Sequence, residues 1–328
     1  MASSQELDVL AIGNALVDVL AHVDDAGLAR MGFEKASYSL LDEDDAERLY
    51  DAMPPSVEVS GGSAANTAAG VDSMGGEAGY VGKVKDDQLG EVFTHDIRAI
   101  GVEYATPPSA DGPPTGRCLI LVTPDAERTM RTYLGAAHEL TAADVDDEQV
   151  TRAKVTYLEG YLWLPDGPRD ALHRAIAAAR GAGRQVALSL SDPFVVETRR
   201  KELLALLDAG DVDLVFGNAD EVTALFEVDE FDAAAAQMQQ RCAVAALTRG
   251  AAGSVVVTAG GDRVAVSAAP VERVVDTTGA GDLFAAGFLY GFTHGADPAE
   301  CGRLGSIAAA EVISHIGARP EVALSTLI

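Results

Sequence analysis

Short apolar runs alternate with longer amphipathic segments along most of the chain. Apolar runs of strand length occupy residues 7–13, 78–84, 155–158, 185–190, 213–216, 243–248 and 254–258. Apolar residues with helical spacing fall between these runs, at 42–53, 64–74, 89–100, 169–181, 203–207 and 233–241, and two late helices are expected from Asp282 and Pro298. Because parallel strands need crossover connections that are usually helices, this alternation predicts an α/β fold whose mainly parallel sheet is covered on both faces.

The pattern changes between residues 102 and 135. Four prolines lie between residues 107 and 114, and two strand-like runs follow at 117–122 and 128–134, joined by a Pro124-Asp125 turn. With another strand-like segment near residue 18, these runs predict a small β-strand lid inserted at about residues 15–40 and 102–135. The chain has no internal repeat, low-complexity tract or long linker, so one domain over residues 1–328 is expected.

The excess of acidic residues limits the kinds of molecule to which the protein can bind. Asp and Glu total 51 against 24 Lys and Arg, a formal charge of −27. Such a surface repels nucleic-acid phosphates and anionic membranes. The three cysteines show no C-x-x-C spacing, and the first ten residues lack both a basic segment and an apolar signal core. We therefore expect a soluble cytoplasmic protein with neither a nucleic-acid nor a membrane partner.

The strongest local motif is the segment from Asp276 to Asp282, which reads DTTGAGD and leads into the apolar run LFAAGFLYGF. Glycines directly before a helix leave backbone N–H groups free to bind an anion. An aspartate in the first turn would lie beside a bound phosphate, where it could take a proton from an attacking hydroxyl group. Taken alone, however, the motif also fits a glycine-rich turn with Asp282 as a simple helix cap.

The complete string resembles the C-terminal signature of the ribokinase-like (phosphofructokinase B) carbohydrate kinase family. A second family signature is matched by GGSAAN at residues 61–66, followed by Gly75-Gly76 and by VGKV at 81–84. The resemblance extends over nearly the whole chain. It implies a ribokinase-like three-layer sandwich with a mainly parallel central sheet and a β-strand lid, and an ATP-dependent phosphotransferase with an alcohol group as acceptor.

Other segments resemble the adenosine kinases within this family. They are GNALVD at 13–18, YSL at 38–40, PPTGRC at 113–118, LSLSDPF at 188–194 and FGNADE at 216–221. This resemblance implies transfer of the γ-phosphoryl group of ATP to the 5′-hydroxyl of adenosine, giving AMP and ADP, as in purine salvage, by a monomer or homodimer. The family tends to carry paired phenylalanines where this chain has Tyr161-Leu162.

The resemblance also assigns roles to individual residues. Asp282 would be the general base, Gly279, Ala280 and Gly281 would form the anion hole, and Arg128 would turn onto the phosphates. Arg131 is a nearby rival of Arg128, and the sequence alone does not show which of them faces inward. The positions that resemble the nucleoside-binding ones are Asn14, Asp18, Leu40, Gly61, Gly62, Ser63, Asn66, Met130, Leu134 and Tyr161.

ATP and metal ions are implied in the same way. The nucleotide-side positions are Asn218, Glu221, Thr248, Arg249, Gly250, Ser306 and Ala309. Glu221 would hold Mg²⁺ through water, whereas Asp276 and Thr278 would take part in a site for a monovalent cation such as K⁺. On spacing alone, N-x-x-E is equally typical of a helix capping box, and Met and Leu on strands are ordinarily core residues.

Several functions compete with the leading one. A kinase for ribose or another furanose belongs to the same class, and a non-catalytic nucleoside sensor on the same fold belongs to another. The intact Asp282, Gly279 and Gly281 speak against the sensor. A Rossmann dehydrogenase is disfavoured because the first strand ends in Gly13-Asn14 and not in G-x-G-x-x-G, and the absence of a Walker sequence disfavours a P-loop kinase.

Overall fold

The computed structural model describes residues 6–125 and 127–328. The first five residues, which belong to the N-terminal segment predicted to lack a targeting signal, lie outside this range. In the described part of the chain, no helix combines the length and apolar character needed to cross a membrane.

A nine-stranded sheet forms the centre of the molecule, in the order β14-β13-β12-β11-β10-β9-β1-β5-β6. Every neighbouring pair from β12 to β6 is parallel, and β13 and β14 extend one edge in antiparallel pairing. The strands are β1 (Leu7–Ile12), β5 (Ala78–Val81), β6 (Glu103–Tyr104), β9 (Ala153–Leu158), β10 (Gln185–Ser189), β11 (Leu214–Asn218), β12 (Val244–Thr248), β13 (Ser254–Thr258) and β14 (Arg263–Val266).

Helices cover both faces of this sheet because its strands are apolar on both faces. In β1, Val9 and Ala11 belong to one buried cluster, whereas Leu10 and Ile12 belong to the other. The first cluster includes α3 (Ser63–Ser73), α4 (Gln88–Ile100), α10 (Ala280–Thr293) and α11 (Pro298–Val312). The second includes α5 (Asp147–Arg152), α6 (Asp166–Gly181), α7 (Pro193–Ala209), α8 (Ala219–Phe226) and α9 (Phe231–Gln239).

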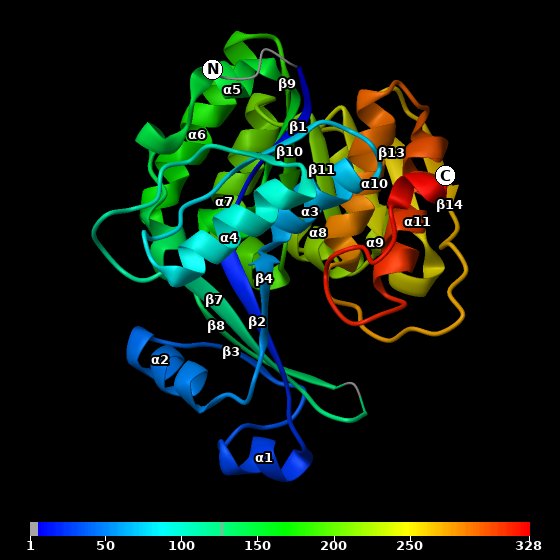
Figure 1. Cartoon of the computed structure of the whole chain (residues 1–328). Helices are drawn as coiled ribbons and strands as arrows, with labels where there is room; N and C mark the ends of the chain where they lie inside the picture. The colour runs from blue at the N-terminus through cyan, green and yellow to red at the C-terminus, as the bar shows by residue number, and fades with distance from the viewer. Residues whose placement is uncertain (1–5, 126) are drawn as a thin grey trace.

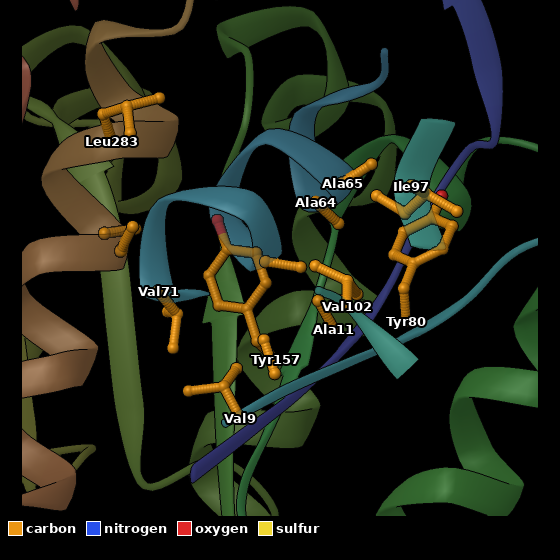
Figure 2. Packing of buried hydrophobic residues seen from close by; sticks show 14 of the residues in the cluster. Val9, Ala11, Ala64, Ala65, Val71, Tyr80, Ile97, Val102, Tyr157 and Leu283 are labelled. Atoms are coloured by element: carbon orange, nitrogen blue, oxygen red, sulfur yellow. The ribbon is translucent and has the colours of Figure 1, made fainter. Parts of the chain in front are cut away.

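Small residues of α3 allow this helix to lie close to the sheet. Figure 2 shows Ala64, Ala65 and Val71 of α3 in the same cluster as Val9 of β1 and Leu283 of α10. A Cβ atom at Gly70, on α3, would lie 2.5 Å from the Cβ of Ala286, so α3 and α10 also approach each other closely. This packing brings the start of α3 next to the start of α10.

A second sheet of five strands projects from one end of this three-layer body (Figure 1). Its order is β3-β8-β7-β2-β4, with bounds β2 (Leu16–His22), β3 (Tyr38–Leu40), β4 (Val57–Gly61), β7 (Gly116–Val122) and β8 (Arg128–Tyr133). Helices α1 (Asp25–Arg30) and α2 (Glu43–Ala52) lie between its strands in the sequence and pack against this small sheet. Short 3₁₀ turns complete the chain: η1 (Gly135–Glu139), η2 (Ala142–Asp144), η3 (Gly160–Trp163), η4 (Gly250–Ala252) and η5 (Leu324–Thr326).

The two faces of the small sheet differ. Val17 and Val19 of β2 and Leu119 of β7 belong to a buried cluster that includes Leu28 of α1 and Leu49 of α2. The alternate residues, among them Asp18 of β2, therefore lie on the opposite face. On that face Cys118, Ile120 and Val122 of β7 form a small buried cluster, against which Met130 of β8 and Ile316 pack.

These observations confirm the predicted fold class. The predicted hairpin of β7 and β8 is present, and the predicted strands of the large sheet are found within a few residues of their expected bounds. The structure adds β4, which lies outside both predicted lid ranges, and extends the short helix expected at 203–207 to the 17 residues of α7. The single domain with an inserted lid stays a prediction.

Candidate active site

A cavity of about 270 Å³ lies at the carboxyl ends of the central parallel strands, beside the start of α10. Four larger hollows among the described residues, of about 390–650 Å³, lie elsewhere, and none of them is lined by a predicted site residue. Ligands in open α/β sheets typically bind beyond the carboxyl ends of the strands, so the smaller cavity is the relevant one. The predicted residues that line it are Ser63, Tyr161, Asn218, Glu221, Thr248, Thr278, Gly279, Gly281 and Asp282.

Asp282 lies in the first turn of α10 and is held by two side chains of α3. Ser63 donates from Oγ to Asp282 Oδ1 at 2.7 Å, and Asn66 donates from Nδ2 to Oδ2 at 3.0 Å. Burial raises the pKa of Asp282 above its ordinary 3.8, and the hydrogen bonds from Ser63 and Asn66 oppose this rise. The carboxylate is thus oriented by two donors and is more basic than an exposed aspartate, as a general base requires.

The two glycines at the start of α10, Gly279 and Gly281, differ in backbone conformation and in the space around them. Gly279 has φ +77°, and a Cβ there would lie 2.8 Å from the Cβ of Ala318, whereas a Cβ at Gly281 would meet nothing within 4 Å. Leu283 makes the first bond of the helix, from its N–H to Gly279 O at 2.8 Å. The N–H groups of Gly281 and Asp282, which directly precede Leu283, therefore have no helical acceptor and are available to an anion.

Ala280 takes a different part in this loop. Its N–H donates to Thr277 O at 3.2 Å, which closes the turn before the helix. Of the three predicted anion-hole residues, Gly281 therefore offers the open N–H and the open space, and Gly279 supplies the backbone conformation.

Two buried amide oxygens lie beside Asp282 at one end of the site. Asn14 Oδ1 and Asn66 Oδ1 are buried and have no hydrogen-bond partner among the described residues. The other end of each amide is occupied, because Asn66 donates to Asp282 and Asn14 Nδ2 donates to Glu159 Oε1 at 2.6 Å. Buried acceptors are rarely left unpaired, so this end fits a ligand with hydroxyl donors.

Glu159 was not predicted from the sequence. It follows β9, is almost fully buried, and also accepts from the N–H groups of Ala64 at 2.9 Å and of Asn14 at 3.3 Å. A Cβ on Gly13 would lie 2.3 Å from Glu159 Oε2, so this glycine makes room for the carboxylate. Burial raises the pKa of Glu159 to about 7, and the three hydrogen bonds oppose the rise. The residue fixes which end of the Asn14 amide points into the site.

Asp18 on β2 lies against the Gly61-Gly62 pair, where β4 turns into α3. A Cβ on Gly61 would come within 2.4–2.6 Å of the Asp18 carboxylate, and one on Gly62 (φ +98°) would lie 2.1 Å from Asn14 O. Both glycines are therefore required for Asp18 and Asn14 to stand side by side. Burial raises the pKa of Asp18 to about 6, while Arg319 and Arg128 hold it down.

Arg319 is a second residue that the sequence did not point to. Its guanidinium donates to Ala65 O at 2.7 Å and to Ser60 O at 3.0 Å, which ties the last part of the chain to β4 and α3. Burial lowers its pKa, and the neighbouring Asp18 opposes this. Its positive charge also acts on Asp282, and so stabilises both carboxylates of the site.

The predicted base-binding residues come from the small sheet and from the large body. Tyr38 and Leu40 of β3 are 59% and 55% exposed, and Tyr38 pairs with Met130 of β8. Tyr161, on the large body, donates from its hydroxyl to Ser191 O at 3.3 Å. Leu134 follows β8 and directly precedes η1. The predicted apolar positions are thus divided between β3 and β8 of the small sheet and η3 of the large body.

Arg128 and Arg131 lie on opposite faces of β8. Arg131 donates to Ser37 O at 2.9 Å and stacks over the Phe33 ring, on the side of the sheet that packs on helices. Arg128 Nη2 lies 2.7 Å from Asp276 Oδ2, at the loop before α10. Arg128 is therefore the arginine that faces the site.

The nucleotide-side residues divide into two groups. Asn218 and Glu221 line the cavity as a reciprocal capping box: Asn218 Nδ2 donates to Glu221 Oε1 at 2.7 Å, and Glu221 N–H donates to Asn218 Oδ1 at 2.9 Å. Thr248 also lines the cavity and Gly250 begins η4, whereas Arg249 is stacked over the Phe231 ring. Ser306 and Ala309 lie on α11 and do not line this cavity.

The capping box fits a magnesium ion held through water. Each oxygen of the Glu221 carboxylate accepts a bond from Asn218, at 2.7 and 2.9 Å, and keeps acceptor capacity toward the cavity. Burial raises the pKa of Glu221 to about 7, so a nearby cation would favour its ionised form. Magnesium usually keeps several waters and takes few protein ligands, which agrees with this donor set.

Asp276 and Thr278 do not fit a directly bound monovalent cation. Asp276 Oδ1 accepts from the Thr278 N–H at 3.0 Å and from its hydroxyl at 2.8 Å. Oδ2 accepts from the Gly317 N–H at 3.1 Å and faces Arg128. A carboxylate has about four acceptor positions, and these N–H and O–H donors take three of them. The Arg128 guanidinium, 2.7 Å from Oδ2, already supplies a positive charge at the remaining side of the carboxylate.

Comparison with known proteins shows which family and which solved structures this chain resembles. The sequence profile of the family described as "pfkB family carbohydrate kinase" matches residues 41–323. The chain is 53% identical to the crystal structure of adenosine kinase from Sinorhizobium meliloti, with a TM-score of 0.90 and 98% of each chain covered. It is 47% identical to the structure of a probable sugar kinase protein from Rhizobium etli, with a TM-score of 0.91 and 98% of each chain covered. It is also 29% identical to Adenosine kinase 1 of Arabidopsis thaliana, over 94% of each chain.

Proposed function

Because this chain belongs to the pfkB family of carbohydrate kinases, we propose that it transfers the γ-phosphoryl group of ATP to the 5′-hydroxyl of adenosine, giving AMP and ADP. The enzyme is a phosphotransferase with an alcohol group as acceptor and is similar to adenosine kinases. One observation supports an acceptor with several hydroxyl groups: Asp282 lies beside two buried amide oxygens that lack a donor among the described residues.

The chemical step uses Asp282 as the base. Its carboxylate accepts the proton of the 5′-hydroxyl as that oxygen forms a bond to the γ-phosphorus. The bond between this phosphorus and the β,γ-bridging oxygen breaks, and its electron pair leaves with ADP. The open N–H groups of Gly281 and Asp282 donate to the oxygens of the transferred group, and the guanidinium of Arg128 adds positive charge nearby.

The sugar hydroxyls pair with the groups that lack partners. Hydroxyl donors of the ribose would satisfy Asn14 Oδ1 and Asn66 Oδ1, and Asp18 would accept from an adjacent hydroxyl. The purine would then lie between the small sheet and the large body, with Leu40 and Met130 on one side and Tyr161 on the other. Closure of the small sheet would exclude water from the phosphoryl group.

ATP would occupy the cavity side of the large sheet. Asn218 and Glu221 would hold Mg²⁺ through water, and bound Mg²⁺ would offset negative charge on the phosphates. Thr248 and Gly250 would contact the nucleotide after β12, while Ser306 and Ala309 of α11 would lie toward its base. We also propose that the enzyme works in the cytoplasm, as a monomer or homodimer.

A panel of acceptors tests the substrate. ADP release is measured with ATP and Mg²⁺ for adenosine, inosine, ribose, fructose and water alone. We expect the kcat/KM for adenosine to be well above that for any free sugar. Faster turnover of ribose or fructose would identify a sugar kinase instead. The similarity to a probable sugar kinase protein of Rhizobium etli is the observation that favours this alternative. Binding without turnover would identify a nucleoside sensor.

A further inference from the structure

Arg128 connects the small sheet to the loop before α10. From β8, its Nη2 reaches Asp276 Oδ2 at 2.7 Å and its Nη1 donates to Thr278 Oγ1 at 3.3 Å. Both side chains of the ion pair are well shielded from solvent, with 7% of Arg128 and 6% of Asp276 exposed. The pair therefore lies where salt screens it poorly.

In the loop before α10, the positive charge of Arg128 offsets the negative charge of Asp276. Asp276 places a negative charge a few residues before Gly279, where phosphate oxygens would bind, so an uncompensated carboxylate would repel the nucleotide. Thr278 N–H and Gly317 N–H accommodate this carboxylate but carry no net charge. Of the groups in direct contact with it, the Arg128 guanidinium is the cation.

We propose that the Arg128 guanidinium takes the place of a bound monovalent cation at Asp276 and Thr278. A guanidinium and an alkali-metal ion bring the same unit charge, and the guanidinium already lies 2.7 Å from Asp276 Oδ2, where a bound ion would have to lie. A second cation would also be repelled by the first across a few ångströms. Arg128 is then a positioning residue: the anion-binding loop is stiffened by a side chain of the small sheet and not by an ion from solution.

This arrangement makes the loop depend on the position of the small sheet. An ion from solution would bind whether the cleft is open or closed, whereas Arg128 reaches Asp276 only when β8 lies near the loop. The chain also offers a matched control, because Arg131 lies on the same strand but bonds to Ser37 on the opposite face.

The test compares K⁺ with tetramethylammonium, both as chlorides at equal ionic strength, on the full chain. The variants are Arg128→Met, Arg128→Gln as a second choice if the first does not fold, and Arg131→Met as the control. Thermal unfolding without substrate is the first measurement, and ADP release is the second. Only the second rests on the proposed function, so a wrong acceptor would leave the thermal result intact.

We expect the wild type and Arg131→Met to have the same Tm in both salts. In Arg128→Met, K⁺ but not tetramethylammonium should raise the Tm by about 2 °C or more, because an ion now enters the vacated position. K⁺ should also restore part of the lost turnover in that variant. A saturable, K⁺-specific rise of Tm or turnover in the wild type would overturn the proposal. So would a folded Arg128 variant with no K⁺-specific change in Tm, or an equal K⁺ response in Arg131→Met.

Discussion

The amide of Asn66 connects Asp282, the proposed base, to the end of the site proposed to hold the sugar: its Nδ2 donates to Asp282 Oδ2 at 3.0 Å, and its buried Oδ1 has no partner among the described residues. A ribose hydroxyl that donates to this oxygen would fix the amide and, through it, the carboxylate. If Asp282 is the base, binding of the acceptor and orientation of the base are coupled through one side chain.

Replacing Asp282 with asparagine should lower kcat by about 10²–10⁴-fold while the fold and ATP binding persist, because an amide does not accept the hydroxyl proton effectively. Steady-state ADP release and calorimetric ATP binding measure the two effects. Ser63→Ala is the control: it removes one of the bonds to Asp282 but not the base, so its loss should be much smaller. Near-normal turnover in folded Asp282→Asn would show that another group takes the proton.

The two glycines of the anion-binding loop should respond differently to valine. Gly281→Val places its side chain in open space, so the Tm should change little while turnover falls, because the side chain obstructs the phosphate. Gly279→Val should also destabilise the protein, since a φ of +77° costs a β-branched residue roughly 1–3 kcal/mol and Ala318 is in the way. Thermal unfolding and ADP release separate the two. A stable and fully active Gly281→Val would place the phosphate elsewhere.

Turnover should depend on pH through Asp18. Burial raises its folded-state pKa from 3.8 to about 6, so the carboxylate is ionised above pH 6 and becomes protonated as the pH falls below it. A protonated Asp18 accepts a ribose hydroxyl less well, and we expect kcat/KM for adenosine to fall on the acid side of about pH 6. Asp18→Asn should be less active at pH 8 and should lack this transition, which pH profiles of both proteins would show. An identical acid limb in the variant would assign the titration to another group, such as Asp282.

Leu40→Asp should reduce the use of adenosine selectively. The side chain is 55% exposed without substrate, so the change should leave the fold intact. With a purine bound beside it, an unpaired carboxylate would be desolvated at a cost of about 1–3 kcal/mol, a loss of roughly 5–150-fold in kcat/KM. Any turnover of ribose should be unaffected. Val57→Asp, at the far end of β4 from Gly61, is an exposed control on the same sheet. Equal losses in both variants would indicate a general effect on the small sheet.

Hydrogen exchange should reveal closure of the small sheet. Amides from Arg117 to Leu134 should exchange more slowly when adenosine is added, because contact with the large body limits opening of β7 and β8. Strand β13 lies in the large sheet away from the cavity and should show no change. Equal exchange of β7 and β8 with and without ligand would indicate a static, preformed site.

The alternation of side chains along a strand could have shown from the sequence which of Arg128 and Arg131 faces the site. Residues two apart on a strand share a face, so Arg128 goes with Met130, which was already expected at the substrate, and Arg131 goes to the other side. The structure places both accordingly. The local signatures likewise located Asp282, Ser63 and Asn66, because each motif spans only a few residues and contains its own turn.

Glu159 and Arg319 could not be predicted in this way. Glu159 bonds to Asn14, 145 positions away, and Arg319 bonds to Ser60, 259 positions away. Their neighbours follow from the order of the strands and the path of the last loop, not from a local pattern. Strand β4 was missed for a similar reason, since it is short and half-exposed and forms by pairing with β2.

The contacts of Gly317 with Asp276 and of Arg319 with Ser60 and Ala65 have a consequence for synthesis of the protein. Domains begin to fold while the ribosome is still adding residues. A nascent chain whose residue 319 is still inside the ribosome lacks the contacts that this residue makes with β4 and α3. We therefore expect productive nucleotide binding only after this segment has been synthesised.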